Sequence, residues 1–268
     1  MLNRPPVTDM KVLMIGDVVG RPGRRAVKEH LPALREDRKI DLVIANAENL
    51  AGGNGITRET ADELFSYGVD FLTGGNHIWD KKESYSYIEE ESRLVRPANY
   101  PPGVPGAGYR VFSVGAYKVG VINLCGRTFM PHLDCPFRKG EEIAAAITAE
   151  TRIIVVDFHA EATSEKIALG WFLDGKVTAF FGTHTHVQTA DERILPGGTA
   201  YITDVGMTGP RDGVIGVRRD AVIVKYLTQL PKRFEVASGP YQFNACLVTI
   251  DPDTGKARAI ERIQAFEK

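Results

Sequence analysis

Side chains that can bind metal ions or transfer protons follow several apolar segments of this sequence. Asp17 comes shortly after the apolar run at residues 11–15, and His159 follows the run at residues 152–158 directly. Ligands of open α/β sheets bind where the carboxyl ends of the strands meet the loops, so we expect these side chains to gather at one edge of a sheet. The candidate metal ligands are Asp17, Glu48, Asn49, Asn76, His159, His184 and His186, and His77 lies beside Asn76.

The mixture of ligand types indicates the kind of metal site. Carboxylate and amide oxygens are hard ligands, imidazole nitrogens are borderline, and no cysteine joins them, which suits Mn, Fe or Zn better than a thiolate zinc site or a Mg/Ca cage. The candidates outnumber the ligands that one ion needs, so we expect two ions, with Glu48 able to bridge them. Two ions roughly 3.5–4 Å apart can generate a hydroxide at neutral pH and hold both oxygens of an in-line phosphoryl displacement.

Some of these residues also have ordinary structural explanations. Asp17 after a strand could be a helix N-cap, and Glu48 beside a glycine-rich segment could shape a turn. His159 could be a buried histidine satisfied by a backbone carbonyl. His184 and His186 are harder to explain in this way, because alternation in a strand or extended loop puts both imidazoles on one side. For this pair the residues alone favour metal binding.

The elements that must position these side chains alternate along the chain. Alternating strands and helices indicate a largely parallel sheet covered by helices. No linker or repeat divides the chain, so we expect one domain at residues 11–268 after a lead-in at residues 1–10. Strands are predicted at residues 11–15, 42–45, 69–72, 152–158 and 177–181, two further strands within 109–124, a hairpin at 241–263, and helices at 20–38, after Thr57, at 140–149 and at 164–173.

Composition narrows the classes of function. The 268 residues carry a formal net charge of -1. Proteins that bind long nucleic acid through its phosphates usually have an excess of basic residues, so this class of function is disfavoured. Three cysteines without a CxxC pair indicate reduced thiols. The first residues lack the apolar region of a secretory signal, and no apolar run reaches the ~20 residues of a membrane helix. We therefore expect a cytoplasmic protein that acts on a small molecule and does not associate with a membrane. Assembly as a homo-oligomer stays open.

Several short motifs carry a resemblance to a known superfamily. Gly16–Asp17, Gly75–His77, the lone His159 and Gly182–His186 resemble the calcineurin-like metallophosphoesterases. Longer motifs at residues 47–49, 74–77, 183–193 and 203–210 are similar to one branch, the YmdB-like cyclic-nucleotide phosphodiesterases. The resemblance runs from about residue 11 to the C-terminus. It implies an α/β fold, a four-layer αββα sandwich in which two packed mixed sheets are flanked by helices.

The resemblance also implies a role for each candidate residue. It implies a centre of two metal ions, di-iron with manganese or zinc as alternatives, which hydrolyses small nucleotides of the 2′,3′- or 3′,5′-cyclic AMP type. A metal-bound hydroxide would attack phosphorus, and His77 would protonate the leaving oxygen, a role that suits an imidazole near its own pKa. One ion would be held by Asp17, Glu48, Asn49 and His186, and the other by Glu48, Asn76, His159 and His184.

The chain departs from the wider superfamily at three places. The usual Asp-x-His motif reads Asp17-Val18-Val19, so one imidazole is absent, and Glu48 stands where an Asp usually bridges the ions. The wider superfamily usually has an acidic residue directly after the Asn-His pair. Here that position is Ile78, and Asp80 stands two positions later. The sequence therefore supplies no carboxylate directly after His77.

Further candidates have weaker motifs, and other functions remain open. Arg127 could donate two hydrogen bonds from its guanidinium group to a phosphate, or it could form a surface salt bridge. His132 could contact the substrate, or it could be an exposed residue without a role in the site. Asp204, after a strand-like run, could orient a ligand histidine. The same two-metal core would also serve a phosphomonoesterase or nucleotidase, short RNA ends remain possible substrates, and a non-catalytic metal-binding regulatory module is a further alternative.

Overall fold

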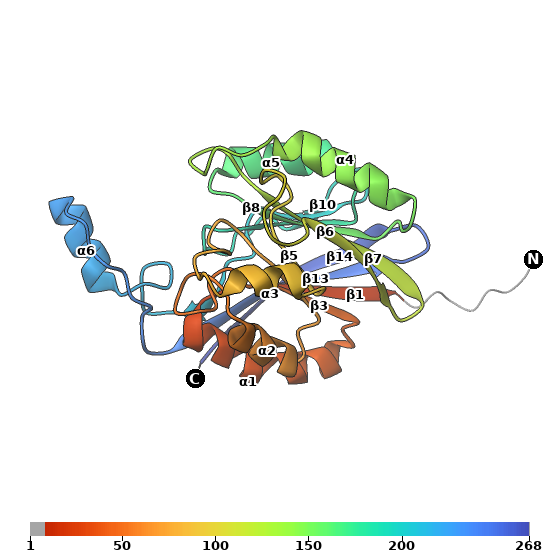
Figure 1. Cartoon of the computed structure of the whole chain (residues 1–268). Coiled ribbons are helices and arrows are strands. Elements are labelled where there is room, and N and C mark those ends of the chain that lie inside the picture. The colour runs from red at the N-terminus through yellow and green to blue at the C-terminus, as the bar shows by residue number, and fades with distance from the viewer. Residues whose placement is uncertain (1–8, 268) are drawn as a thin grey trace, which may run out of the picture.

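Two mixed β-sheets pack face to face, and helices cover the outer face of each (Figure 1). This computed structural model describes residues 9–267. The lead-in predicted at residues 1–10 lies almost wholly outside the described residues, and the first strand begins at Met10. The order of layers is α1 and α2, the first sheet, the second sheet, then α4 and α5, which confirms the predicted four-layer αββα sandwich. Whether residues 11–268 form one folding unit stays a prediction.

The first sheet has the strand order β2-β12-β13-β1-β3-β4-β5, and β14 pairs with β13. Strands β1, β3, β4 and β5 are parallel, whereas β13 runs antiparallel to β1, so the sheet is mixed. Its strands are β1 (Met10–Ile15), β2 (Asp17–Val18), β3 (Leu42–Asn46), β4 (Phe71–Thr73), β5 (Leu94–Val95), β12 (Met207–Pro210), β13 (Tyr241–Asp251) and β14 (Lys256–Phe266).

The second sheet has the order β10-β11-β9-β8-β7-β6. Its centre is parallel, and the antiparallel strands β6 and β10 form the two edges. The hairpin predicted within residues 109–124 is confirmed as β6 and β7. The strands are β6 (Tyr109–Val114), β7 (Tyr117–Cys125), β8 (Ile154–His159), β9 (Ala179–Thr183), β10 (Arg193–Ile194) and β11 (Ala200–Ile202).

All four predicted helices are present, and α1 spans the predicted residues 20–38. Thr57 caps α2 through a capping box with Thr60, as the sequence indicates. The helix predicted at residues 140–149 begins earlier, at Pro136, because proline is well accepted in the first helical turn. Helices α3 and α6 were not predicted. The helices are α1 (Gly20–Arg38), α2 (Arg58–Ser66), α3 (Ser84–Glu90), α4 (Pro136–Thr148), α5 (Thr163–Leu173) and α6 (Arg219–Thr228).

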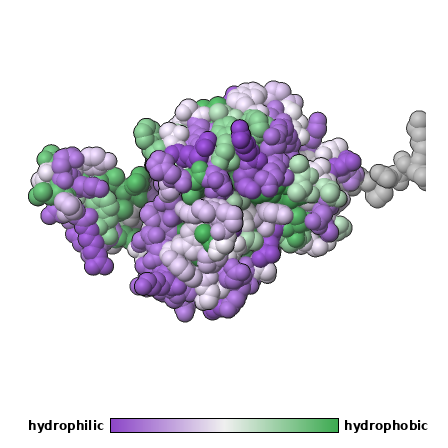
Figure 2. Space-filling view, turned by 45° about the horizontal axis from the view of Figure 1, so that its top comes forward, coloured by the Kyte–Doolittle hydropathy of each residue, from purple (hydrophilic) through white to green (hydrophobic). Residues whose placement is uncertain are grey.

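Helix α6 projects from the body on the segment that joins β12 to β13 (Figure 1). We call residues 211–240 the arm. Figure 2 shows apolar surface on this projecting part, and its exposed side chains include Ile223, Leu227 and Leu230. None of the helices in residues 9–267 is long and apolar enough to cross a bilayer.

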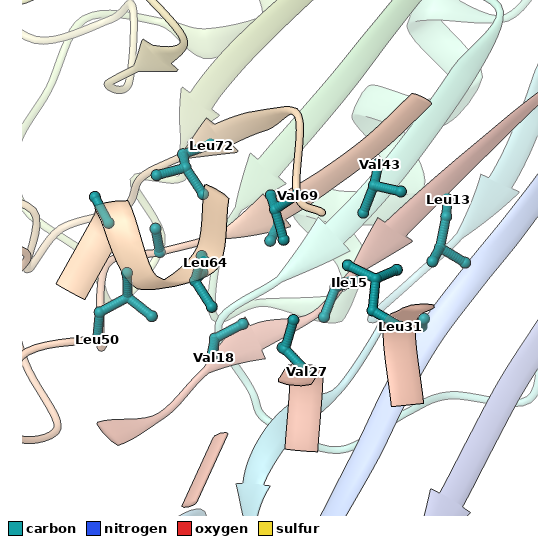
Figure 3. Close-up of a cluster of buried hydrophobic side chains, with 14 of the residues drawn as sticks. Leu13, Ile15, Val18, Val27, Leu31, Val43, Leu50, Leu64, Val69 and Leu72 are labelled. Carbon is teal, nitrogen blue, oxygen red and sulfur yellow. The ribbon is translucent and has the colours of Figure 1, made fainter. Parts of the chain in front are cut away.

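The alternation of side chains along β1 shows why both of its faces are apolar. Leu13 and Ile15 point toward α1 and α2, where they pack with Val27 and Leu31 of α1 (Figure 3). Val12 points the other way and packs between the two sheets. Successive side chains of a strand lie on opposite faces, so a strand between two layers must be apolar throughout. Burial of each such large apolar side chain stabilises the folded state by about 1.5–3 kcal/mol relative to leaving it exposed.

Candidate metal centre and active site

The predicted ligands meet at the shared end of the two sheets. The expectation of one sheet edge was too simple, because the first sheet and the loops after it supply every candidate oxygen ligand, whereas β8 of the second sheet and the loop after β9 supply every candidate imidazole ligand. A buried hydrogen bond connects the two sheets near this end. Asn46 Nδ2, at the end of β3, donates to Asp157 Oδ2 in β8 at 3.0 Å. The candidate oxygen ligands are Asp17, Glu48, Asn49 and Asn76, and the candidate imidazoles are those of His159, His184 and His186.

The Nε2 atom of His159 has three neighbouring side-chain atoms at the spacing expected between ligands of one metal ion. Glu48 Oε1 and Asn76 Oδ1 each lie 3.1 Å from it, and His184 Nδ1 lies 3.0 Å from it. One ring nitrogen can make only one hydrogen bond, so hydrogen bonding does not account for all three contacts. Ligands about 2.1 Å from a common ion lie about 3.0 Å apart when they are at right angles to one another. The spacing therefore fits a metal ion, and Glu48, His159 and His184 form a cluster able to hold one.

A second group of candidates surrounds Asp17. Its Oδ2 accepts a hydrogen bond from the backbone N–H of His184 at 3.1 Å, but its buried Oδ1 has no hydrogen-bond partner. His186 Nε2 lies 3.8 Å from this oxygen and 3.4 Å from the amide nitrogen of Asn49. An orphaned carboxylate oxygen in the interior is costly unless a cation compensates it. The residues present therefore fit a metal ion here as well.

The electrostatics of this site favour a bound cation. Burial raises the pKa of Asp17, and the charges of the nearby histidines offset this only in part. Burial also acts to raise the pKa of Glu48, but the charge and hydrogen bond of His159 outweigh it and lower the pKa to about 2. Desolvation opposes the charged form of His159, yet Glu48 and then Asp17 raise its pKa to about 9. The two buried carboxylates thus hold positive charge where the ligands meet.

The outer ring nitrogens of His159 and His186 are hydrogen-bonded and that of His184 lies beside a carboxylate, which leaves the inner nitrogen of each ring facing the site. His159 Nδ1 lies 3.0 Å from Thr183 Oγ1, which itself donates to Asp157. His184 Nε2 is 3.2 Å from a carboxylate oxygen of Glu161, and His186 Nδ1 donates to the Ile215 carbonyl at 2.8 Å. Hydrogen bonds of this kind fix the tautomer and orientation of metal-binding histidines. The ordinary explanation of His159, a ring satisfied by a backbone carbonyl, is therefore wrong.

The loop that carries His184 and His186 is not extended, contrary to the prediction. Strand β9 ends at Thr183, and both histidines have positive φ, 100° and 66° respectively, which is unusual for residues other than glycine. Asp17 is likewise not a helix N-cap, because Val19 occupies that position before α1. The imidazoles face the site because the backbone turns twice, and not because of strand alternation.

A buried ion pair holds this turn in place. Lys166 Nζ in α5 lies 2.6 Å from Asp204 Oδ2, and neither side chain is exposed. The same oxygen accepts hydrogen bonds from the N–H and hydroxyl of Thr185, at 3.0 and 2.7 Å. Asp204 was predicted to orient a ligand histidine; it reaches the residue between the two histidines instead of either ring.

Beneath the site lies a buried hydrogen-bond network around Asp157. Its carboxylate accepts from Asn46, from Thr73 at 2.5 Å and from Thr183 at 2.7 Å. Burial raises its pKa to about 6, against the opposing effect of the His159 charge. Asp157 and Lys166 were not predicted from the sequence. Asp157 stands two positions before His159 in a strand, so the period of two would have placed both on one face.

The remaining candidates lie at different places. His77 is next to the cluster: its backbone N–H donates to Glu48 Oε2 at 2.8 Å, and its half-exposed ring faces a cavity of about 540 Å³. Arg127 and His132 are exposed and do not line this cavity. A substrate contact of Arg127 or His132, and the metal-binding role of the clustered residues, stay predictions.

The chain is similar to known proteins along nearly its whole length. The chain matches the model of the family described as YmdB-like protein over residues 13–263. It is 52% identical over 254 residues to the 2′,3′-cyclic-nucleotide 2′-phosphodiesterase of Bacillus subtilis (strain 168), over 95% of this chain and 96% of that protein. A crystal structure of a hypothetical protein from Thermus thermophilus has a TM-score of 0.91 and 44% identity, over 97% of this chain and all of that one.

A more distant structure shares the fold alone. The NAD nucleotidase of Haemophilus influenzae superposes with a TM-score of 0.62 at 14% identity, over 96% of this chain and 56% of the other.

Proposed function

The chain belongs to the YmdB-like family, and from this premise we propose that it is a metal-dependent phosphodiesterase that opens the ring of 2′,3′-cyclic nucleotides. The observation that carries the proposal is the convergence of Glu48, Asn76 and His184 on the Nε2 atom of His159, directly beside His77. The named activity of the Bacillus subtilis relative supplies the substrate class.

Two groups of side chains would hold two ions, iron or a metal of similar preference. When bound, such ions supply Lewis-acid chemistry: they lower the pKa of water and stabilise negative charge on a phosphoryl group. Glu48 lies between the groups and would serve both. The first group is Asp17, Glu48, Asn49 and His186, and the second is Glu48, Asn76, His159 and His184.

The amide ligands set the charge of the site. Asn49 and Asn76 would bind through amide oxygens without negative charge, so only Asp17 and Glu48 would offset the charge of the ions. A phosphodiester anion is therefore repelled less than it would be by an all-carboxylate site. This balance suits a small anionic substrate.

His77 is placed to protonate the leaving oxygen. A ribose alkoxide is a poor leaving group unless it gains a proton as the bond to phosphorus breaks. The His77 ring lines the cavity, and its Nδ1 is engaged by Asp80 at 2.8 Å, so its Nε2 is free to donate. In a 2′,3′-cyclic nucleotide the proton would pass to O2′, and the product would be the nucleoside 3′-phosphate.

The proposal is tested with protein whose metal content has been measured by elemental analysis. We expect turnover of 2′,3′-cyclic AMP to 3′-AMP, followed by chromatography, to stop on chelation and to return when Fe, Mn or Zn is restored. Assays with 3′,5′-cyclic AMP and with 3′-AMP separate a broader phosphodiesterase and a phosphomonoesterase from the proposed activity.

Glu48→Gln is the matched variant, because it keeps the size of the side chain and removes the shared charge. Loss of the second ion and of turnover is expected. A rate that persists after chelation, or a preference for 3′-AMP over the cyclic substrate, would contradict the proposal. A protein that binds two ions but turns over none of these compounds would favour a regulatory module.

A further inference from the structure

One wall of the active-site cavity is apolar and comes from the base of the arm. There Val217 forms β-bridges with Val214 and Val236, and the N–H of Arg218 donates to the carbonyl of Glu235 at 2.9 Å. Side chains two positions apart lie on the same face of such a ladder, and paired residues share that face. Val217 and its partner Val236 therefore share one face with Phe234, two positions before Val236. Ile215 lies in the turn between Val214 and Val217, with φ 46°, and all four side chains line the cavity.

This face is partly uncovered. Phe234 is 41% exposed and Ile215 is 52% exposed, although both belong to a cavity wall. Lys225 Nζ of α6 lies 4.9 Å from the centroid of the Phe234 ring, so this cation helps to fix the ring. Exposed aromatic and aliphatic side chains that line a concave site favour an apolar ligand group.

Contacts on both flanks connect the wall to the rest of the site. The Ile215 carbonyl accepts the hydrogen bond from His186, so the turn that carries Ile215 also orients a candidate ligand. On the opposite side Val236 packs on the glycine-rich loop, where a Cβ on Gly53 would come within 2.6 Å of its Cγ2. The backbone of Gly53, with φ +101°, leaves room for this contact. The cavity therefore has a polar end at the histidines and an apolar end at Phe234.

From this arrangement we propose that the arm-base face, Ile215, Val217, Phe234 and Val236, binds the nucleobase of the substrate, with Phe234 as its stacking partner. The inference rests on the proposed function, which puts the phosphate at the histidine end. The base is then the only flat apolar part of the substrate, and a cavity of about 540 Å³ is of the size that holds such ligands. Stacking does not read hydrogen-bonding edges, so all four bases are accepted, with purines preferred.

The test compares Phe234→Ala with the wild type on a substrate with a base and on one without. For 2′,3′-cyclic AMP we expect kcat/KM to fall about tenfold or more, mainly through KM, as expected for loss of one base–aromatic stack. For glycerol 1,2-cyclic phosphate, which keeps the cyclic phosphodiester but has no base, we expect a change of less than about twofold. Phe234→Trp should restore the preference for cyclic AMP.

Tyr226→Ala is the matched control, because Tyr226 is an exposed aromatic residue of the same arm that does not line the cavity. Equal losses on both substrates, or no loss on cyclic AMP, would overturn the assignment. Calorimetric binding of 3′-AMP to the metal-loaded protein separates the two proposals. If the wild type turns over neither substrate, the proposed function fails, while a tenfold weaker binding of 3′-AMP by Phe234→Ala still supports the base site and an unchanged affinity rejects it.

Discussion

The Nδ1 atom of His77 lies 2.8 Å from the Oδ2 atom of Asp80. The motif gave no carboxylate directly after His77, yet the chain folds back within one turn and supplies one from three positions later. The same oxygen accepts from the Asn54 side chain at 2.8 Å, which holds the carboxylate in place. The pair fixes which ring nitrogen of His77 faces the cavity.

We predict that His77→Ala lowers kcat for 2′,3′-cyclic AMP by about 10²–10⁴-fold and that Asp80→Asn lowers it less. The reason is loss of proton donation to the leaving alkoxide. The check is a second substrate, a p-nitrophenyl phosphodiester, whose leaving group needs no proton. A loss of equal size on that substrate, or a loss of bound metal, would show that His77 acts in another way.

Breaking the buried ion pair of α5 should destabilise the protein and loosen the histidine turn. Lys166→Met leaves Asp204 buried without its cation, and we expect a loss of about 3–5 kcal/mol in the free energy of unfolding. Metal affinity should fall as well, because Asp204 holds Thr185 between two candidate ligands. Denaturant titration and competition with a chelator measure the two effects.

The control for this prediction is Lys176→Met. Lys176 is 42% exposed and pairs with Glu141 at the surface, where such a pair contributes at most about 1 kcal/mol. If Lys166→Met were no more harmful than Lys176→Met, the buried pair would have no role in holding the turn.

The hydroxyl of Thr183 connects Asp157 to the His159 ring, so its removal should weaken metal binding. We expect Thr183→Val to lower metal affinity about 10–100-fold, as is typical when a partner of a metal-binding histidine is lost. Metal titration in a calorimeter measures the change. Thr148→Val is the comparison, since that hydroxyl donates only to the Ala144 carbonyl within α4. Unchanged affinity in Thr183→Val would mean that Thr183 does not orient His159.

Asp191 should make stability depend on pH in the acid range. Burial opposes its charge, but hydrogen bonds from Thr203 and Thr189 outweigh this and lower its pKa below the usual 3.8. A carboxyl group whose pKa is lower in the folded state stabilises the protein above the unfolded pKa, and this stabilisation is lost as pH falls through the folded pKa.

We therefore expect wild type to melt at a higher temperature than Asp191→Asn at pH 7, and the difference to shrink as pH falls below about 4. Thermal unfolding of both proteins at matched pH values measures it. A difference that is constant between pH 7 and pH 3 would assign the effect to the shape of the site and not to the charge of Asp191.

The position of the candidate metal centre could be predicted from the sequence. The residues that hold the candidate ligands in place could not. Asp17, His159 and the two later histidines stand at strand ends, and strand ends meet in sheets of this kind. Lys166 gave no such signal, because a lysine in an amphipathic helix is normally exposed and only packing shows that it is buried. The contact between Ile215 and His186 uses a backbone carbonyl, so no side chain marks it.

The division of the candidate ligands between the sheets would make bound metal ions cross-links. Residues 17–76 bring all the oxygen donors and residues 159–186 bring all the nitrogen donors, so neither stretch alone can complete either coordination sphere. A half-assembled chain would offer a metal only one ligand chemistry, and the bound pair would resist any sliding of one sheet over the other. Loading with metal would thus report that the two halves of the sandwich have docked in register.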